Sequence, residues 1–188
     1  RYVDVGCRGF GEHTSKLPID HKLHQELYRL CGRLGMPILM HLAFGKSETY
    51  GVMDSLDLRA LEGLVRRYSD VNFIMHGPGW WSGMSSLVPP DEPYPKGPIA
   101  APGRTPYILE GYGNVYGDIS AGSGYNALNR DPEFARGFVK KQSRKLIYGT
   151  DLEGFFEPQD IHIKLLESLK LAEADYENIY HGNLEHIM

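Results

Sequence analysis

The sequence is poor in the features that mark secreted, disulfide-bonded or cysteine-ligated proteins. Only two cysteines, Cys7 and Cys31, occur among its 188 residues. Their spacing fits neither a disulfide framework nor a Cys-x-x-Cys metal site, so we expect both to be buried, reduced thiols. Reduced cysteines favour a cytoplasmic location. The chain opens at Arg1 with neither an initiator Met nor a signal-peptide pattern.

Concentrated positive charge and long apolar runs are also missing. The chain has 20 basic and 24 acidic residues, and no basic run exceeds two, as at Lys140-Lys141. Nucleic-acid binding needs a concentrated positive field, so we expect no nucleic-acid partner. No apolar run approaches the ~20 residues that span a bilayer, so we expect no membrane partner.

Short apolar segments alternate with amphipathic segments along the chain. The apolar segments predict buried strands at 8–12, 38–42, 71–76, 115–120 and 145–151. Helical periodicity predicts helices at 20–34, 58–68, 131–141, 159–169 and 175–188. Apolar strands that alternate with helices indicate a parallel sheet covered by helices, and the length suits one domain over residues 1–188.

The predicted strand ends are spaced like the units of a (β/α)8 barrel. Successive ends lie 29, 35, 42 and 33 residues apart, against roughly 30 residues per unit in a TIM barrel. The longest interval contains the segment 77–103, which holds 7 of the 12 prolines and 5 glycines. So little periodicity indicates either an active-site loop or disorder, and the Trp80-Trp81 pair favours an ordered loop.

Four of the predicted strands end in ionisable side chains, namely Glu12, His41, His76 and Asp151. The carboxyl ends of barrel strands meet at one face, where barrel active sites are built. Two imidazoles and two carboxylates together suit a zinc-type ion. A histidine alone at a strand end is more often a hydrogen-bonded core residue than a ligand, but the pattern on two consecutive strands, with Asp151 after the last, favours a shared site. Glu12 could instead pair with Arg8 or Lys16.

Two further segments are candidates for contact with a substrate. Trp80 and Trp81 follow the strand of His76 and could form an aromatic wall or lid, or could simply pack against the barrel rim. The segment SAGSGYN, which ends in Tyr125 and Asn126, could offer backbone N–H groups to an anion or merely begin a helix. We expect three histidines beside the first helix to be solvated or helix-capping residues: His13, His21 and His24. His13 adjoins Glu12 and could instead support the candidate ligands. We expect the histidines of the last two helices to lie on the surface: His162, His181 and His186.

Several phrases of the sequence resemble one enzyme family. The position of His41 after a strand and the phrases NFIMHGPGWW, VYGDISAGSGYNAL and LIYGTDL resemble the second amidohydrolase family, whose members are metal-dependent hydrolases on a distorted TIM barrel. The ending IYHGNLEHIM is similar to the closing helix of that family, with its usual asparagine at Asn183. The resemblance runs from about residue 8 to residue 188.

The resemblance implies a role for each strand-end residue. His41 and His76 match the ligands of the fifth and sixth strands, Glu12 matches the bridging acid of the fourth, and Asp151 matches the aspartate of the eighth. One or two divalent ions, zinc foremost, would be the cofactor. Asp151 would accept a proton from the attacking water, and His76 would bind metal or donate a hydrogen bond to the substrate. Asp118 would have a structural or substrate-contacting role.

The implied activity is hydrolysis of an amide, ester or lactone of a small molecule. A second reaction on the same site would be non-oxidative decarboxylation of an unsaturated or aromatic acid. The sequence departs from the family because it has no His-x-His pair of a first strand, so we expect a partial barrel with strands four to eight only. Such a chain would be a fragment or a trimmed relative with little activity alone, a non-catalytic barrel remnant, or a homo-oligomer whose copies cover the open sheet edges.

Overall fold

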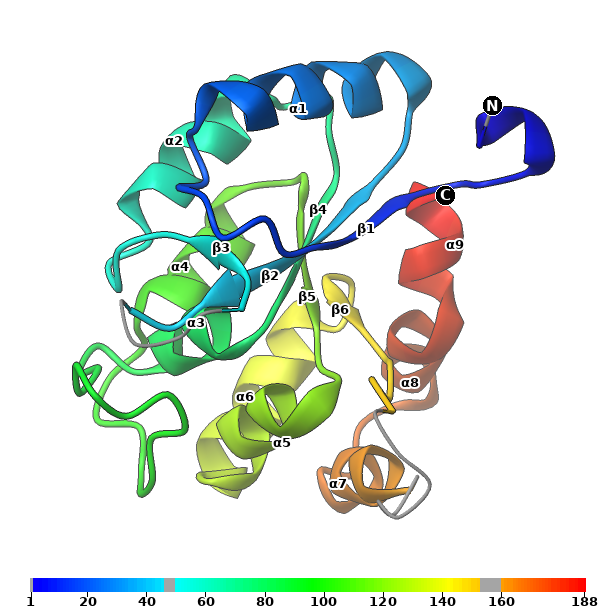
Figure 1. Cartoon of the computed structure of the whole chain (residues 1–188). Helices are drawn as coiled ribbons and strands as arrows, with labels where there is room; N and C mark the ends of the chain where they lie inside the picture. Colours follow the sequence, from blue (N-terminus) through cyan, green and yellow to red (C-terminus); the bar gives the residue numbers. More distant parts are fainter. Residues whose placement is uncertain (1, 46–49, 153–159) are drawn as a thin grey trace.

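A parallel sheet forms the centre of the protein. The computed structural model describes residues 2–45, 50–152 and 160–188 (Figure 1). The sheet has the strand order β1-β2-β4-β5-β6, and β3 pairs with β2 beside this path. The strands are β1 (Phe10–His13), β2 (Ile38–Ala43), β3 (Val52–Met53), β4 (Phe73–His76), β5 (Val115–Asp118) and β6 (Leu146–Ile147). The predicted parallel α/β fold is therefore confirmed.

Helices surround the sheet in Figure 1. They are α1 (Lys22–Leu34), α2 (Arg59–Arg67), α3 (Pro78–Trp81), α4 (Arg104–Gly111), α5 (Ala121–Asn129), α6 (Pro132–Gln142), α7 (Ile161–Ser168), α8 (Glu173–Glu177) and α9 (Asn183–Ile187). Short 3-10 turns lie at Val3–Val5 and Ser82–Met84, and a π-helical turn at Asn178–Gly182 joins α8 to α9. None of the described helices is long and apolar enough to cross a membrane.

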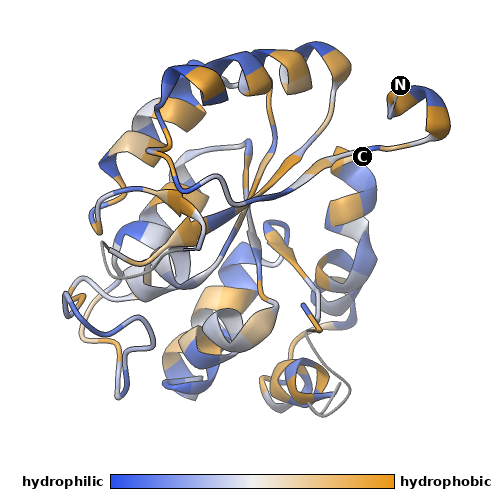
Figure 2. Cartoon of the chain, viewed as in Figure 1, coloured by the Kyte–Doolittle hydropathy of each residue, from blue (hydrophilic) through white to orange (hydrophobic). Residues whose placement is uncertain are grey.

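The two faces of the sheet pack against different partners. The larger core lies between the sheet and helices such as α1 and α2, and Figure 2 shows the apolar residues on the strands and on one side of α1. A smaller cluster joins Ile74, Tyr116 and Ile147 of neighbouring strands to Ile187 of α9. Because side chains alternate along a strand, the residues two positions after Ile74 and Tyr116 share their face. These residues are His76 and Asp118, so the small cluster forms the layer beneath them.

Asn183 links the C-terminal helix α9 to the sheet through hydrogen bonds. This side chain is buried, and its Nδ2 donates to the carbonyl oxygens of Ser143 and Leu146, each at 2.7 Å. Both acceptors border β6, and an amide that satisfies two buried carbonyls fixes the helix against that strand. The asparagine singled out in the sequence is thus a structural residue.

Several predicted elements differ in detail from the structure. Strand β6 ends at Ile147, four residues before Asp151, which lies outside the strand with φ +50°. The segment 77–103 contains α3 and a 3-10 turn rather than loop alone. The predicted helix at 175–188 is interrupted by the π-helical turn, and α4 and β3 were not expected. Cys31 is buried as predicted, but the prediction for Cys7 was wrong, because this thiol is exposed.

Candidate metal centre

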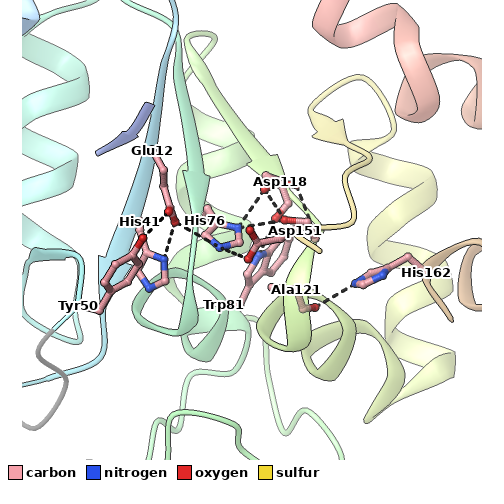
Figure 3. A network of polar contacts seen from close by, with 10 residues as sticks. Glu12, His41, Tyr50, His76, Trp81, Asp118, Ala121, Asp151 and His162 are labelled. Atoms are coloured by element: carbon pink, nitrogen blue, oxygen red, sulfur yellow. Dashed lines mark hydrogen bonds and ion pairs between the residues drawn. The ribbon is translucent and has the colours of Figure 1, made fainter. Parts of the chain in front are cut away.

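Three of the predicted ligands meet at the carboxyl ends of neighbouring strands. Glu12 comes from β1, His41 from β2 and His76 from β4, and one ligand atom of each lies within 4.8 Å of the others. His41 and His76 are register partners in the parallel β2–β4 pair. The Nδ1 atom of His41 lies 2.8 Å from Oε1 of Glu12 (Figure 3). Parallel register therefore assembles residues that are 29 and 35 positions apart in the sequence.

His76 is the centre of this cluster and is almost completely buried. Its Nε2 atom lies 3.7 Å from Oε1 of Glu12 and 3.6 Å from Oδ2 of Asp151. Its Nδ1 atom lies 2.9 Å from Oδ2 of Asp118. Burial disfavours a charged imidazole, but the hydrogen bond to Asp118 and the three carboxylates outweigh burial and raise the pKa of His76.

Asp118 holds the ring of His76 in one orientation. The carboxylate is buried and also accepts hydrogen bonds from the backbone N–H of Ser120 at 3.0 Å and from the Ser120 hydroxyl at 2.6 Å. With its carboxylate fixed in this way, Asp118 receives the Nδ1 proton of His76 and leaves Nε2 directed toward Glu12 and Asp151. This is the usual arrangement of a metal-binding histidine backed by a carboxylate.

A cavity of about 470 Å³ opens beside the cluster. It is lined by the four predicted ligands and by six further residues: Tyr50, Pro78, Tyr94, Ala121, Gly122 and Ser123. Tyr50 donates a hydrogen bond of 2.7 Å to Oε2 of Glu12, and its ring meets that of His41 edge to face at 4.8 Å. Sequence reasoning missed Tyr50, because it lies in no predicted element and its contact with Glu12 spans 38 residues.

The predicted aromatic wall is not found where the sequence suggested. Trp80 is fully buried and Trp81 is 2% exposed, and neither lines the cavity. Both belong to the core because α3 turns their rings inward, and Trp81 donates through Nε1 to the carbonyl oxygen of Asp118 at 2.8 Å. The structure therefore corrects their expected place at the substrate and gives them a packing role.

Tyr125 and Asn126 also lie outside the cavity lining. Both are on α5, so the alternative that SAGSGYN begins a helix is the one the structure shows. The ring of Tyr125 meets His162 edge to face at 5.8 Å, and Asn126 donates from Nδ2 to the carbonyl oxygen of Pro95 at 3.1 Å. Asn126 thus anchors the segment 77–103 rather than a ligand.

Three histidines that were expected near the solvent are buried instead. His13, His24 and His162 are 7%, 3% and 4% exposed. His24 lies 2.7 Å from the Ser15 hydroxyl, and His162 lies 3.0 Å from the carbonyl oxygen of Ala121. The prediction for His21 is confirmed, because its Nδ1 accepts the backbone N–H of Leu23 at the start of α1.

The donor set and its spacing fit a divalent ion. Two ligands at ~2.1 Å from one tetrahedral ion lie ~3.4 Å apart. The separations of 3.6 and 3.7 Å from Nε2 of His76 to the two carboxylates are close to that value and too long for hydrogen bonds. Imidazole nitrogen and carboxylate oxygen are the ligands that zinc and manganese sites share.

The parallel α/β sheet carries two imidazoles and two carboxylates at the carboxyl ends of its strands, and three of these side chains form a group that could hold a metal ion. The Amidohydrolase family model matches residues 4–184, and the chain belongs to this family. Comparison with curated protein sequences gives no match.

Solved structures share the fold at low sequence identity. An uncharacterized TIM-barrel protein of Bordetella bronchiseptica is 15% identical with a TM-score of 0.59, and the match covers 90% of this chain and 51% of that chain. An amidohydrolase of Burkholderia multivorans with bound zinc is 9% identical with a TM-score of 0.55, covering 90% and 58%. A 2,6-dihydroxybenzoate decarboxylase from Rhizobium is 15% identical with a TM-score of 0.52, covering 98% and 63%. The chain therefore spans about half to two thirds of these proteins.

Proposed function

We propose that this chain carries the metal centre of a hydrolase that acts on an amide, ester or lactone of a small molecule. The observation that supports the proposal is the convergence of Glu12, His41 and His76 within 4.8 Å, with Asp151 at 3.6 Å from His76. A bound divalent ion would polarise the substrate carbonyl and lower the pKa of water toward ~7. Zinc is the first candidate because it suits nitrogen and carboxylate ligands.

The side chains around the ion have different roles. The ion would be held by Glu12, His41, His76 and Asp151. Tyr50 and Asp118 orient Glu12 and His76 through hydrogen bonds of 2.7 and 2.9 Å. Asp151 lines the cavity with a side chain that is 40% exposed, so it reaches both His76 and the solvent. We assign it to receive the proton of the attacking water at its carboxylate, as a general base.

Non-oxidative decarboxylation of an aromatic or unsaturated acid is the second candidate. The likeness to the Rhizobium decarboxylase favours it, although that likeness concerns the fold. The cavity residues support either reaction, because both require a carboxyl or carbonyl group beside the same ligands. A release assay for carbon dioxide, run beside assays for lactone, ester and amide cleavage, separates the two.

Metal analysis tests the proposal directly. We expect the zinc-loaded protein to retain one or two ions after gel filtration, and His41→Ala and Asp151→Asn to lose most of that metal. His181→Ala is the matched control, since its side chain is 60% exposed and pairs with Glu185 one helical turn away. Absence of retained metal from the wild-type protein would remove the catalytic proposal.

Turnover measurements then test the assignment of the base. We expect Asp151→Asn to abolish any metal-dependent hydrolysis even where some metal remains. Unchanged hydrolysis would show that another residue is the base. Retained metal with turnover of neither substrate class would support the third alternative, a barrel remnant that binds an ion without catalysis.

A further inference from the structure

The imidazole of His41 makes close contacts on several sides of its ring. Its Nδ1 atom lies 2.8 Å from Oε1 of Glu12. The rings of Tyr50 and His76 meet it edge to face, with centroid distances of 4.8 and 5.0 Å (Figure 3). Only 11% of the side chain is exposed. The edge opposite Nδ1, made of Cδ2 and Nε2, therefore decides whether the ring has room to turn.

Two glycines face that opposite edge of the ring. A Cβ on Gly77 would lie 2.7 Å from Cδ2 and 2.8 Å from Nε2 of His41. A Cβ on Gly51 would lie 2.8 Å from the same Cδ2 atom. All three separations are below 3.0 Å, a distance that Cβ atoms in proteins essentially never show. Any larger residue at either position would therefore displace the ring or the backbone beside it.

Strand register brings these glycines to the ring from two different segments. Gly77 directly follows His76, which is the register partner of His41 in β4. Gly51 directly precedes Val52 of β3, which pairs with Leu42 of β2. Gly51 has φ +109° and Gly77 has φ +89°, values that L side chains rarely adopt. Glycine is thus required at both positions for backbone conformation as well as for space.

We propose that Gly51 and Gly77 are positioning residues of the metal centre. Together they form a slot that holds the Cδ2–Nε2 edge of His41 before any ion binds. The inference rests on the proposed function, because the orientation of this ring matters to an ion only where the ring is a ligand. A ligand that is already oriented loses little further freedom when the ion binds, so the slot strengthens metal binding.

The two glycines also lie close to the backbone of β2. A Cβ on Gly77 would lie 2.8 Å from the carbonyl oxygen of Leu42, and a Cβ on Gly51 would lie 2.8 Å from the backbone nitrogen of Ala43. A substitution could therefore act through the imidazole or through the strand. The experiment has to separate these two routes.

Zinc affinity of the full chain, measured by competition with a chelator, tests the slot. We expect Gly77→Ala to bind zinc roughly 10–100-fold more weakly than the wild type, the range found for residues that orient metal ligands. Gly6→Ala and Gly97→Ala are the matched controls. These glycines have φ +98° and +77°, but an added Cβ meets no atom within 4 Å. Both controls carry similar backbone strain and should bind zinc as the wild type does.

A double-mutant cycle with His41→Ala separates the ring from the strand. If the added methyl group acts by turning the imidazole, Gly77→Ala costs no further zinc affinity once the imidazole has been removed. Equal fold-losses with and without His41 would show that the methyl group disturbs β2 instead, and would overturn the proposal. The visible absorption of the cobalt-substituted protein reports ligand geometry, so it should change in Gly77→Ala and stay unchanged in Gly97→Ala.

A measurement on the wild type does not depend on the folding of any variant. Nuclear Overhauser contacts between Hδ2 of His41 and the Hα atoms of Gly51 and Gly77 should be present in the metal-free chain. The same contacts should persist after zinc is added. Contacts that appear only with zinc would show that the ion, rather than the two glycines, orients the ring, and would refute the slot.

The outcomes keep this inference apart from the proposed function. Zinc bound with equal affinity by the wild type and Gly77→Ala would overturn the slot and leave the metal centre intact. A wild-type chain that binds no zinc would contradict the proposed function, and the role of the slot in metal binding would fall with it.

Discussion

The chemistry of this protein is concentrated on one imidazole and its carboxylate neighbours. His76 is buried, and three carboxylates face its two ring nitrogens: Asp118 on Nδ1, and Glu12 and Asp151 near Nε2. Such a concentration of negative charge around one buried ring is costly unless a cation compensates it. The negative charge of these carboxylates raises the pKa of His76, and the same charge would attract a divalent ion.

Asp118 should control metal affinity without touching the ion. We expect Asp118→Asn to weaken zinc binding by roughly 10–100-fold, because an amide cannot accept the Nδ1 proton with the strength of a carboxylate. A competition titration against a zinc chelator measures the change. Asp160→Asn removes an exposed carboxylate that pairs with Lys164 and should leave the affinity unaltered. Equal affinities in wild type and Asp118→Asn would refute the positioning role.

His13 should make the metal-free protein sensitive to acid. Burial, together with the charge of His24, lowers the pKa of His13 to about 4 from 6.5. The unfolded chain therefore binds more protons between about pH 4 and 6.5, so stability rises with pH across that window and is lost as pH falls. Urea unfolding in EDTA should show this slope, and His13→Phe should flatten it. His186→Phe changes an exposed residue and should leave the slope unchanged. An identical slope in the wild type and both variants would show that His13 does not cause the pH dependence.

At the scale of elements, the sequence predicts those strands and helices whose hydrophobic residues recur with a clear period. Strands β2 and β4 read as apolar runs because both faces are covered, and His41 and His76 stand out at their ends for that reason. Helix α4 escaped prediction because Pro106 falls in its first turn, where proline is tolerated although it resembles a loop signal. Proximity to His76 in sequence could not reveal on which side of α3 the tryptophan rings point, and only the packing shows that they face the core.

Gly124 sets how closely α5 approaches the end of β5. A Cβ at this position would lie 2.2 Å from the carbonyl oxygen of Ile119, a backbone atom that cannot step aside cheaply. We expect Gly124→Ala to lower the free energy of unfolding by about 1–3 kcal/mol, as overpacking does. Gly137→Ala in α6 meets no atom within 4 Å and should stabilise by about 0.5–1 kcal/mol. Urea unfolding of both variants checks the opposite signs, and a shift of the same sign would contradict this account.

At the scale of the whole molecule, the sheet is open at β1. Within the described chain this strand pairs with β2 alone, so its other edge presents free backbone groups. A groove of about 780 Å³ lies beside that edge, lined largely by apolar side chains of the N-terminal residues, β1 and α1. Exposed Tyr2, Val3 and Leu30 line this groove. The solved structures that share the fold are longer than this chain, which covers 51% and 58% of two of them.

This apolar groove should govern the association behaviour of the isolated chain. Contiguous exposed apolar surface binds hydrophobic dyes and promotes self-association. We therefore expect strong fluorescence of anilinonaphthalene sulfonate and concentration-dependent light scattering, both reduced by Leu30→Lys, which places a charge in the groove. Leu87→Lys is the matched control, because Leu87 is 70% exposed but lies outside the groove and should alter neither signal. Equal effects of the two substitutions would mean that net charge, rather than the open edge of β1, controls the association.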